Sequence, residues 1–125
     1  MALKATIHKD RLFLLNPNFK DERLGAESQF YFCPFNAMLE GVLHYYPELK
    51  DKLDITYVDF PRPRKPIIHF LGEENQGTPV LVLPSGQEHS TQLPVQQYRE
   101  NRFIHGSEGI AAYLAEKYGI ALIHP

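Results

Sequence analysis

The sequence predicts a single α/β domain, residues 1–125, in which helices flank a mixed four-stranded sheet in the order β-α-β-α-β-β-α. Short apolar runs typical of buried strands alternate with segments whose apolar residues recur at helical spacing. A helix separates the first two runs, which requires a right-handed crossover and a parallel pair. No helix separates the last two, which indicates an antiparallel hairpin.

The first predicted strand is the apolar run "RLFLL" at 11–15. The segment 16–32 follows it and is rich in Asn, Pro, Gly and charged residues, which is typical of a loop. It is long for a connection within a small domain, so we expect it to carry function or to cover an edge of the sheet.

The first predicted helix begins at Pro34, where the missing N–H of proline costs nothing. Cys33 then occupies the N-cap, and Pro47 ends the helix. One predicted apolar face repeats at helical spacing. Its members are Phe35, Met38, Leu39, Val42, Leu43 and Tyr46.

The middle of the chain predicts two further strands with a short helix between them. The strand at 53–60 is rich in β-branched and aromatic residues, and "TPVLVL" at 78–83 is an apolar run before a turn at 84–86. Between the strands, prolines precede a short helical apolar face. This face consists of Ile67, Ile68, Phe70 and Leu71.

The last third predicts an extended loop at 87–101, a short edge strand "RFIH" at 102–105 and a final helix. Ser107 is a suitable N-cap for this helix, and Glu108 complements the positive end of its dipole. Gly119 fits the position just after the last turn.

Composition limits the classes of partner, location and metal site that we expect for this chain. The formal net charge of −2 gives no electrostatic reason to expect nucleic acid or an anionic membrane as a partner. The apolar runs are far shorter than the roughly 20 residues of a membrane span. The single cysteine cannot form an intramolecular disulfide, which favours a cytoplasmic protein, and the scattered histidines predict no metal site.

Three motifs give the chain a resemblance to the thioredoxin fold, from Arg11 to Gly119: "CPFN" at a helix start, "TPVLVL" on the third strand and "SEGIAAYLAEKYG" at the end. The chain is most similar to glutaredoxins and to the N-terminal domain of glutathione transferases. It also looks like a family of small bacterial thioredoxin-like proteins of unknown function. The resemblance implies that the peptide bond before Pro79 is cis.

The resemblance also implies monothiol redox or thiol-transfer chemistry at Cys33, with glutathione as substrate or co-substrate and no resident cofactor. The N-terminus of a helix favours the thiolate, which is the reactive form. Arg64, in the basic stretch "RPRK", would bind the glycyl carboxylate, Thr78 would pair with the peptide backbone, and Ser107 would hold the γ-glutamyl end. The implied ligand-binding residues are Pro34, Phe35, Asn36, Arg64, Thr78, Pro79, Ser107 and Glu108.

The sequence departs from the family pattern at two positions. Asn36 replaces the second cysteine of a dithiol motif, and Gly106 replaces the acidic residue that usually precedes the serine. Dithiol reduction is therefore excluded for this chain. From its place at the next turn, Asn36 is expected to donate its amide N–H to the sulfur.

Each candidate also has a structural explanation. Cys33 could instead be a small buried apolar residue, and "RPRK" a solvated turn. Ser107 and Glu108 could serve only to cap their helix. The alternative functions are therefore a non-catalytic binding or adaptor module and a thiol sensor oxidised to sulfenic acid. The predicted edge strand and several tyrosines leave homodimerisation open. These tyrosines are Tyr45, Tyr46 and Tyr98.

Overall fold

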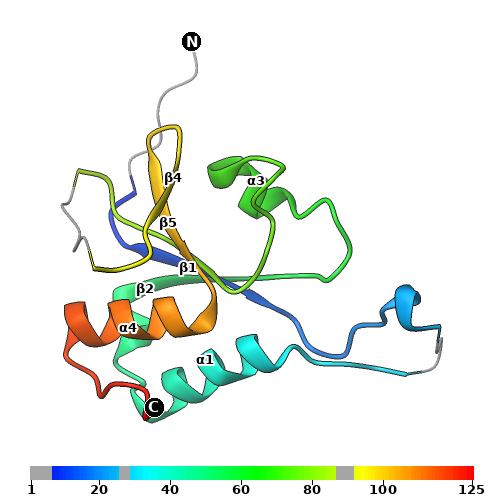
Figure 1. The fold of residues 1–125 in the computed structure, drawn as a ribbon, viewed down its shortest axis with the longest axis horizontal. Coiled ribbons are helices and arrows are strands. Elements are labelled where there is room, and N and C mark those ends of the chain that lie inside the picture. Colours follow the sequence, from blue (N-terminus) through cyan, green and yellow to red (C-terminus); the bar gives the residue numbers. More distant parts are fainter. Residues whose placement is uncertain (1–6, 26–28, 87–91) are drawn as a thin grey trace.

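A computed structural model describes residues 7–25, 29–86 and 92–125 as a mixed sheet flanked by helices on both faces (Figure 1). The strands are β1 (Asp10–Leu15), β2 (Leu53–Val58), β3 (Val80–Val82), β4 (Gln96–Tyr98) and β5 (Asn101–His105). The helices are α1 (Pro34–Tyr45), α2 (Leu49–Lys52), α3 (Lys65–Leu71) and α4 (Ser107–Tyr118), with a 3-10 turn, η1, at Glu22–Leu24.

The sheet has five strands in the order β2-β1-β3-β5-β4, so the prediction of four strands is wrong by one. β1 and β2 are parallel, and every other neighbouring pair is antiparallel. The additional strand, β4, lies within the predicted loop 87–101, of which 87–91 falls outside the described residues. Because β4 pairs with β5, the "RFIH" segment is an inner strand and β4 forms the edge.

Side chains that alternate along the strands supply two separate cores. Leu12 and Leu14 of β1 pack on one face with residues of α1 and α4, whereas Phe13 and Leu15 pack on the other face with residues of α3. In Figure 1, α1 and α4 accordingly lie on one side of the sheet and α3 on the other. Among the described residues, no helix is long and apolar enough to cross a membrane.

Helix α1 begins as predicted, but its buried face differs. Cys33 is the N-cap, Pro34 is the first helical residue, and the helix ends at Tyr45 before Pro47. Phe35 is 62% exposed, whereas Asn36 is only 3% exposed. The prediction that Phe35 belongs to the apolar face is therefore wrong, because the polar Asn36 fills that position.

The N-cap of helix α4 lies one residue before the predicted cap, Ser107. Gly106, with φ 96°, is the N-cap, and the buried Ser107 is the first helical residue, so the prediction of Ser107 as the N-cap is wrong. A positive φ strongly favours glycine, which suits Gly106 to the position before the helix. At the other end, Gly119 caps the helix in the left-handed conformation, as predicted.

The long connection between β1 and α1 is closed at its base. Phe19 and Tyr31 exchange two backbone hydrogen bonds, of 3.1 and 2.8 Å, in an isolated antiparallel bridge. In Figure 1 the connection extends away from the sheet before the chain returns to α1. The bridge therefore fixes the direction from which the chain reaches Cys33.

Candidate functional site

Cys33 is held at the start of α1 by local backbone geometry. Its extended conformation (φ −84°, ψ 121°) and the fixed φ of Pro34 start the helix at this point. Cys33 is a partly exposed residue that packs at the margin of the α3-side core. It is therefore not fully enclosed, unlike a structural cysteine inside a core.

A shallow groove of about 370 Å³ opens beside the thiol, and we call it the Cys33 groove. It is lined by Leu15, Phe19, Asp21, Leu24, Tyr31, Phe32, Cys33, Pro34, Phe60, Arg62, Arg64, Gly77 and Thr78. A larger hollow of about 930 Å³ shares Phe19, Asp21 and Phe60 with it but contains neither a thiol nor a buried charge among its lining residues. The Cys33 groove is therefore the candidate site.

The segment at Thr78 forms one wall of the groove, next to the start of α1. The Thr78–Pro79 peptide bond is cis, as the sequence resemblance implied. The carbonyl of the buried Pro79 accepts a 3.0 Å hydrogen bond from the Gly106 N–H, which ties this turn to the start of α4. Thr78 itself stays partly exposed and lines the groove.

Asn36 connects the wall to the sheet. Its Oδ1 accepts a buried 2.9 Å hydrogen bond from the backbone N–H of Leu15, the last residue of β1. Its Nδ2 donates to Thr78 Oγ1 at 3.4 Å. One of the two amide N–H groups is thus directed to Thr78. Among the described residues neither donates to the Cys33 sulfur, so the expectation of that bond is wrong. Asn36 positions the groove from behind.

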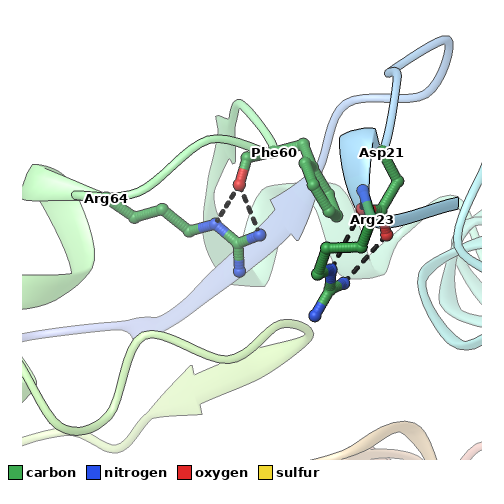
Figure 2. Close-up of polar contacts among 4 residues, drawn as sticks. All are labelled: Asp21, Arg23, Phe60 and Arg64. Atoms are coloured by element: carbon green, nitrogen blue, oxygen red, sulfur yellow. Dashed lines mark hydrogen bonds and ion pairs between the residues drawn. The ribbon is translucent and has the colours of Figure 1, made fainter. Parts of the chain in front are cut away.

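Arg64 is the N-cap of α3 and is buried, with 7% of its surface exposed. Its Nε and Nη2 donate to the Phe60 carbonyl at 3.1 and 2.7 Å, and its Nη1 donates to the Gln76 carbonyl at 2.9 Å. Figure 2 shows the two bonds to Phe60. A solvated turn does not describe this residue, because its guanidinium is enclosed by backbone carbonyls.

Charge in the groove acts on Arg64 in two directions. Burial, and then repulsion from Arg62, lower the pKa of Arg64, and a negative charge on Cys33 would oppose both effects. Arg62, Arg64 and Cys33 all line the groove.

Asp21, the one carboxylate among the groove residues, is engaged elsewhere. Arg23 binds it through Nε to Oδ1 at 3.0 Å and Nη2 to Oδ2 at 2.8 Å (Figure 2). The hydrogen bonds from Arg23 lower the pKa of Asp21. This bidentate pair leaves the Arg64 guanidinium without a carboxylate partner among the described residues.

The structure brings together only some of the residues singled out from the sequence. Cys33, Pro34, Arg64 and Thr78 line the groove. The remaining candidates are not among the residues that line the groove. These are Phe35, Asn36, Pro79, Ser107 and Glu108.

Sequence reasoning missed two aromatic residues of the groove, Phe19 and Phe60. Phe19 stacks on Phe60 with ring centroids 4.4 Å apart and planes 4° apart, although the two belong to different loops. No local pattern indicates such a pairing. Among the described residues, no group of three or more His, Cys, Asp or Glu side chains is arranged to hold a metal ion.

Comparison with known protein families gives one match. A family model described as "Protein of unknown function (DUF3088)" matches residues 9–122. The chain belongs to the DUF3088 family. The match includes every residue that lines the Cys33 groove, so the groove is part of the family's domain. Searches of curated proteins and of solved structures found no match.

Proposed function

We propose that this DUF3088 member performs monothiol chemistry at Cys33 on a thioredoxin-like scaffold. The observation that carries the proposal is a partly exposed cysteine at the N-cap of a 12-residue helix, which lines a groove together with Thr78. The unpaired N–H groups and the dipole at a helix N-terminus favour a thiolate, the nucleophilic form. The parallel β1–β2 pair around α1 and the cis bond before Pro79 support the finer fold assignment.

The reaction is a two-step thiol–disulfide exchange. The Cys33 thiolate attacks one sulfur of a substrate disulfide, a new S–S bond forms, and the other sulfur leaves as a thiolate. A thiolate from solution then attacks the bound half of this mixed disulfide and releases Cys33 as a thiolate. Electrons pass from the solution thiol to the substrate. Cys33 is the sole cysteine of the chain, so the second thiol must come from another molecule.

Glutathione is the proposed solution thiol, because its carboxylates match the charge of the groove. Arg62 lines the groove and is exposed, and it forms no ion pair with the described residues. Its guanidinium suits a bidentate contact with a carboxylate. Arg64 is too enclosed for that role, and the reducing cytoplasm is the compartment in which this chemistry operates.

A second function, a binding module, has one observation in its favour. Three phenylalanines next to Cys33 are more than half exposed, which suits an apolar polypeptide partner. They are Phe30, Phe32 and Phe35, with exposed fractions of 55%, 64% and 62%.

Mass spectrometry after incubation with oxidised glutathione separates the two functions. We expect one glutathione adduct on the folded wild-type chain, its release by reduced glutathione, and no adduct on Cys33→Ser. A folded wild-type chain without an adduct, whose thiol is fully labelled only after unfolding, would contradict thiol chemistry and favour the binding module.

A further inference from the structure

Arg64 carries a buried positive charge that its neighbours do not neutralise. All of its side-chain hydrogen bonds go to the backbone carbonyls of Phe60 and Gln76. Buried charges without a counter-charge are costly, and natural proteins normally pair them. The described residues offer no such partner, because Asp21 is held by Arg23.

The guanidinium also retains hydrogen-bonding capacity. An arginine side chain has five N–H groups. The bonds to Phe60 and Gln76 use one N–H on each of the three nitrogens, which leaves one N–H on Nη1 and one on Nη2. Arg64 lines the same groove as Cys33. The charge of Arg64 therefore borders the space into which Cys33 opens, although the residue is too enclosed to bind a free carboxylate.

The arginine is fixed in place. The bonds to Phe60 and Gln76 hold it, and the Phe60 ring, itself stacked on Phe19, lies 5.6 Å from its guanidinium carbon. In addition, the Arg64 backbone N–H donates to Gln76 Oε1 at 2.7 Å. A group held by four hydrogen bonds and an aromatic face loses little entropy when it meets an anion.

We propose that Arg64 is the positioning residue for the Cys33 thiolate, acting as its counter-charge across the groove. This inference rests on the proposed function and deepens it, because it states what regulates the reactivity of the thiol. A negative charge on Cys33 would oppose the lowering of the Arg64 pKa, which agrees with the two residues lining one groove.

Other ionisable groups also face the thiol and must be separated from Arg64. Asp21, Tyr31 and Arg62 line the groove with it, and His105 packs against Gly77, the residue before Thr78. Asp21 is engaged by Arg23, and Arg62 is exposed to solvent, where salt screens its charge. Arg64 differs from all of them in being a buried cation.

The test is the rate of iodoacetamide alkylation of the full chain as a function of pH. For Arg64→Gln we expect about tenfold slower alkylation at pH 7 than for wild type, with the same plateau at high pH. Arg64→Lys keeps the charge and should recover most of the rate. The matched control is Arg62→Gln, whose smaller effect should disappear in about 1 M KCl, where the screening length is near 3 Å.

A second measurement does not depend on a substituted chain folding. For the wild type, we expect the midpoint of the pH–rate curve to change little between low salt and about 1 M KCl, because a buried pair is weakly screened. Near-UV circular dichroism establishes which variants are folded.

Each outcome decides a different point. Two outcomes would overturn the role of Arg64 and leave the thiol chemistry intact. One is a wild-type pH–rate midpoint that shifts with salt as much as the effect of Arg62→Gln does. The other is a folded Arg64→Gln chain whose pH–rate curve matches that of the wild type. A folded wild-type chain that is not alkylated at any pH would overturn the proposed function itself.

Discussion

At the Asp10 end of β1, a buried carboxylate accepts hydrogen bonds from three donors. Beyond the Leu15 end, the buried Arg64 lines a groove whose one carboxylate, Asp21, is engaged by Arg23. Asp10 has no exposed surface. It accepts hydrogen bonds from the Tyr113 hydroxyl at 2.6 Å, Lys117 Nζ at 2.8 Å and the Tyr118 hydroxyl at 2.5 Å. Lys117 also neutralises it, which is the usual condition for a buried charge.

The difference distinguishes a charge that is neutralised inside the fold from one to which we assign a role by proposal. The Asp10 cluster joins the start of β1 to the last turns of α4, and its carboxylate has no exposed surface that a ligand could reach. The Arg64 side chain has the opposite arrangement, with donors left over and the Cys33 side chain in the same groove. We therefore expect changes at Asp10 to alter stability, and changes at Arg64 to alter reactivity.

The largest effect on stability is expected for Asp10→Asn. The amide cannot neutralise Lys117, and it offers one acceptor oxygen where three donors converge. Because Lys117 is 30% exposed and partly recovers its hydration, we expect a loss of about 2–3 kcal/mol in the free energy of unfolding, measured in urea.

The control for Asp10 is Asp54→Asn, which removes an ion pair with Arg11 at 3.5 Å whose carboxylate is 44% exposed. Exposed pairs contribute little, so the expected loss is below about 0.5 kcal/mol. Equal losses for the two variants would mean that burial of Asp10 has no energetic role.

An intermediate effect is expected for Asn36→Ala, at the groove end of β1. The variant leaves the buried N–H of Leu15 without its acceptor, which should cost about 1–3 kcal/mol. Asn16→Ala provides the comparison, because Asn16 makes only an exposed bond to Asp59, and its loss should stay within about 0.5 kcal/mol. A tolerated Asn36→Ala would refute the role of Asn36 as a support of the groove.

The smallest effect is expected for Tyr118→Phe, which removes one of the three donors to Asp10 and should cost about 1 kcal/mol at pH 8. Burial and the Asp10 carboxylate raise the pKa of Tyr118 above that of a free tyrosine, near 10. A raised pKa in the folded state gives stability that is present below pH 10 and lost as the pH rises further. The difference in the free energy of unfolding between wild type and Tyr118→Phe should therefore narrow above about pH 10.

Tyr57→Phe is the matched control for this titration. Partial burial, and then the hydrogen bond to Glu40, raise the pKa of Tyr57 to about 12, but the pair lies at the surface. Between about pH 10 and 12, we therefore expect a much smaller change in the stability difference between wild type and Tyr57→Phe. If the difference in unfolding free energy between wild type and Tyr57→Phe narrows as strongly as that for Tyr118→Phe, the loss of stability at alkaline pH does not come from the Asp10 cluster.

Local patterns allowed much of the fold to be predicted from the sequence. Pro34 marks the start of α1, Gly119 marks the end of α4, and the alternation of Leu12, Phe13 and Leu14 gives β1 two buried faces. Each of these features depends on residues close together in the chain, so spacing and residue type are sufficient to indicate them.

Features that depend on distant partners were not predictable. The polar Gln96–Tyr98 segment becomes a strand only because β5 pairs with it. Asn36 displaces Phe35 from the buried face because the end of β1 needs an acceptor. Arg64 belongs to a basic stretch typical of a surface turn, and its burial follows from carbonyls supplied by Phe60 and Gln76. The sequence indicated the thiol and its helix but not the charge beside it.

The pair of backbone bonds between Phe19 and Tyr31 also bears on how such a chain tolerates change. Since these bonds anchor both ends of the excursion, residues inserted or deleted between 20 and 30 need not redirect the approach to Cys33. Doubling the length of a flexible loop costs only about 0.6 kcal/mol in closure entropy. The outer surface near Cys33 can therefore change in size while Cys33 itself keeps its place at the start of α1.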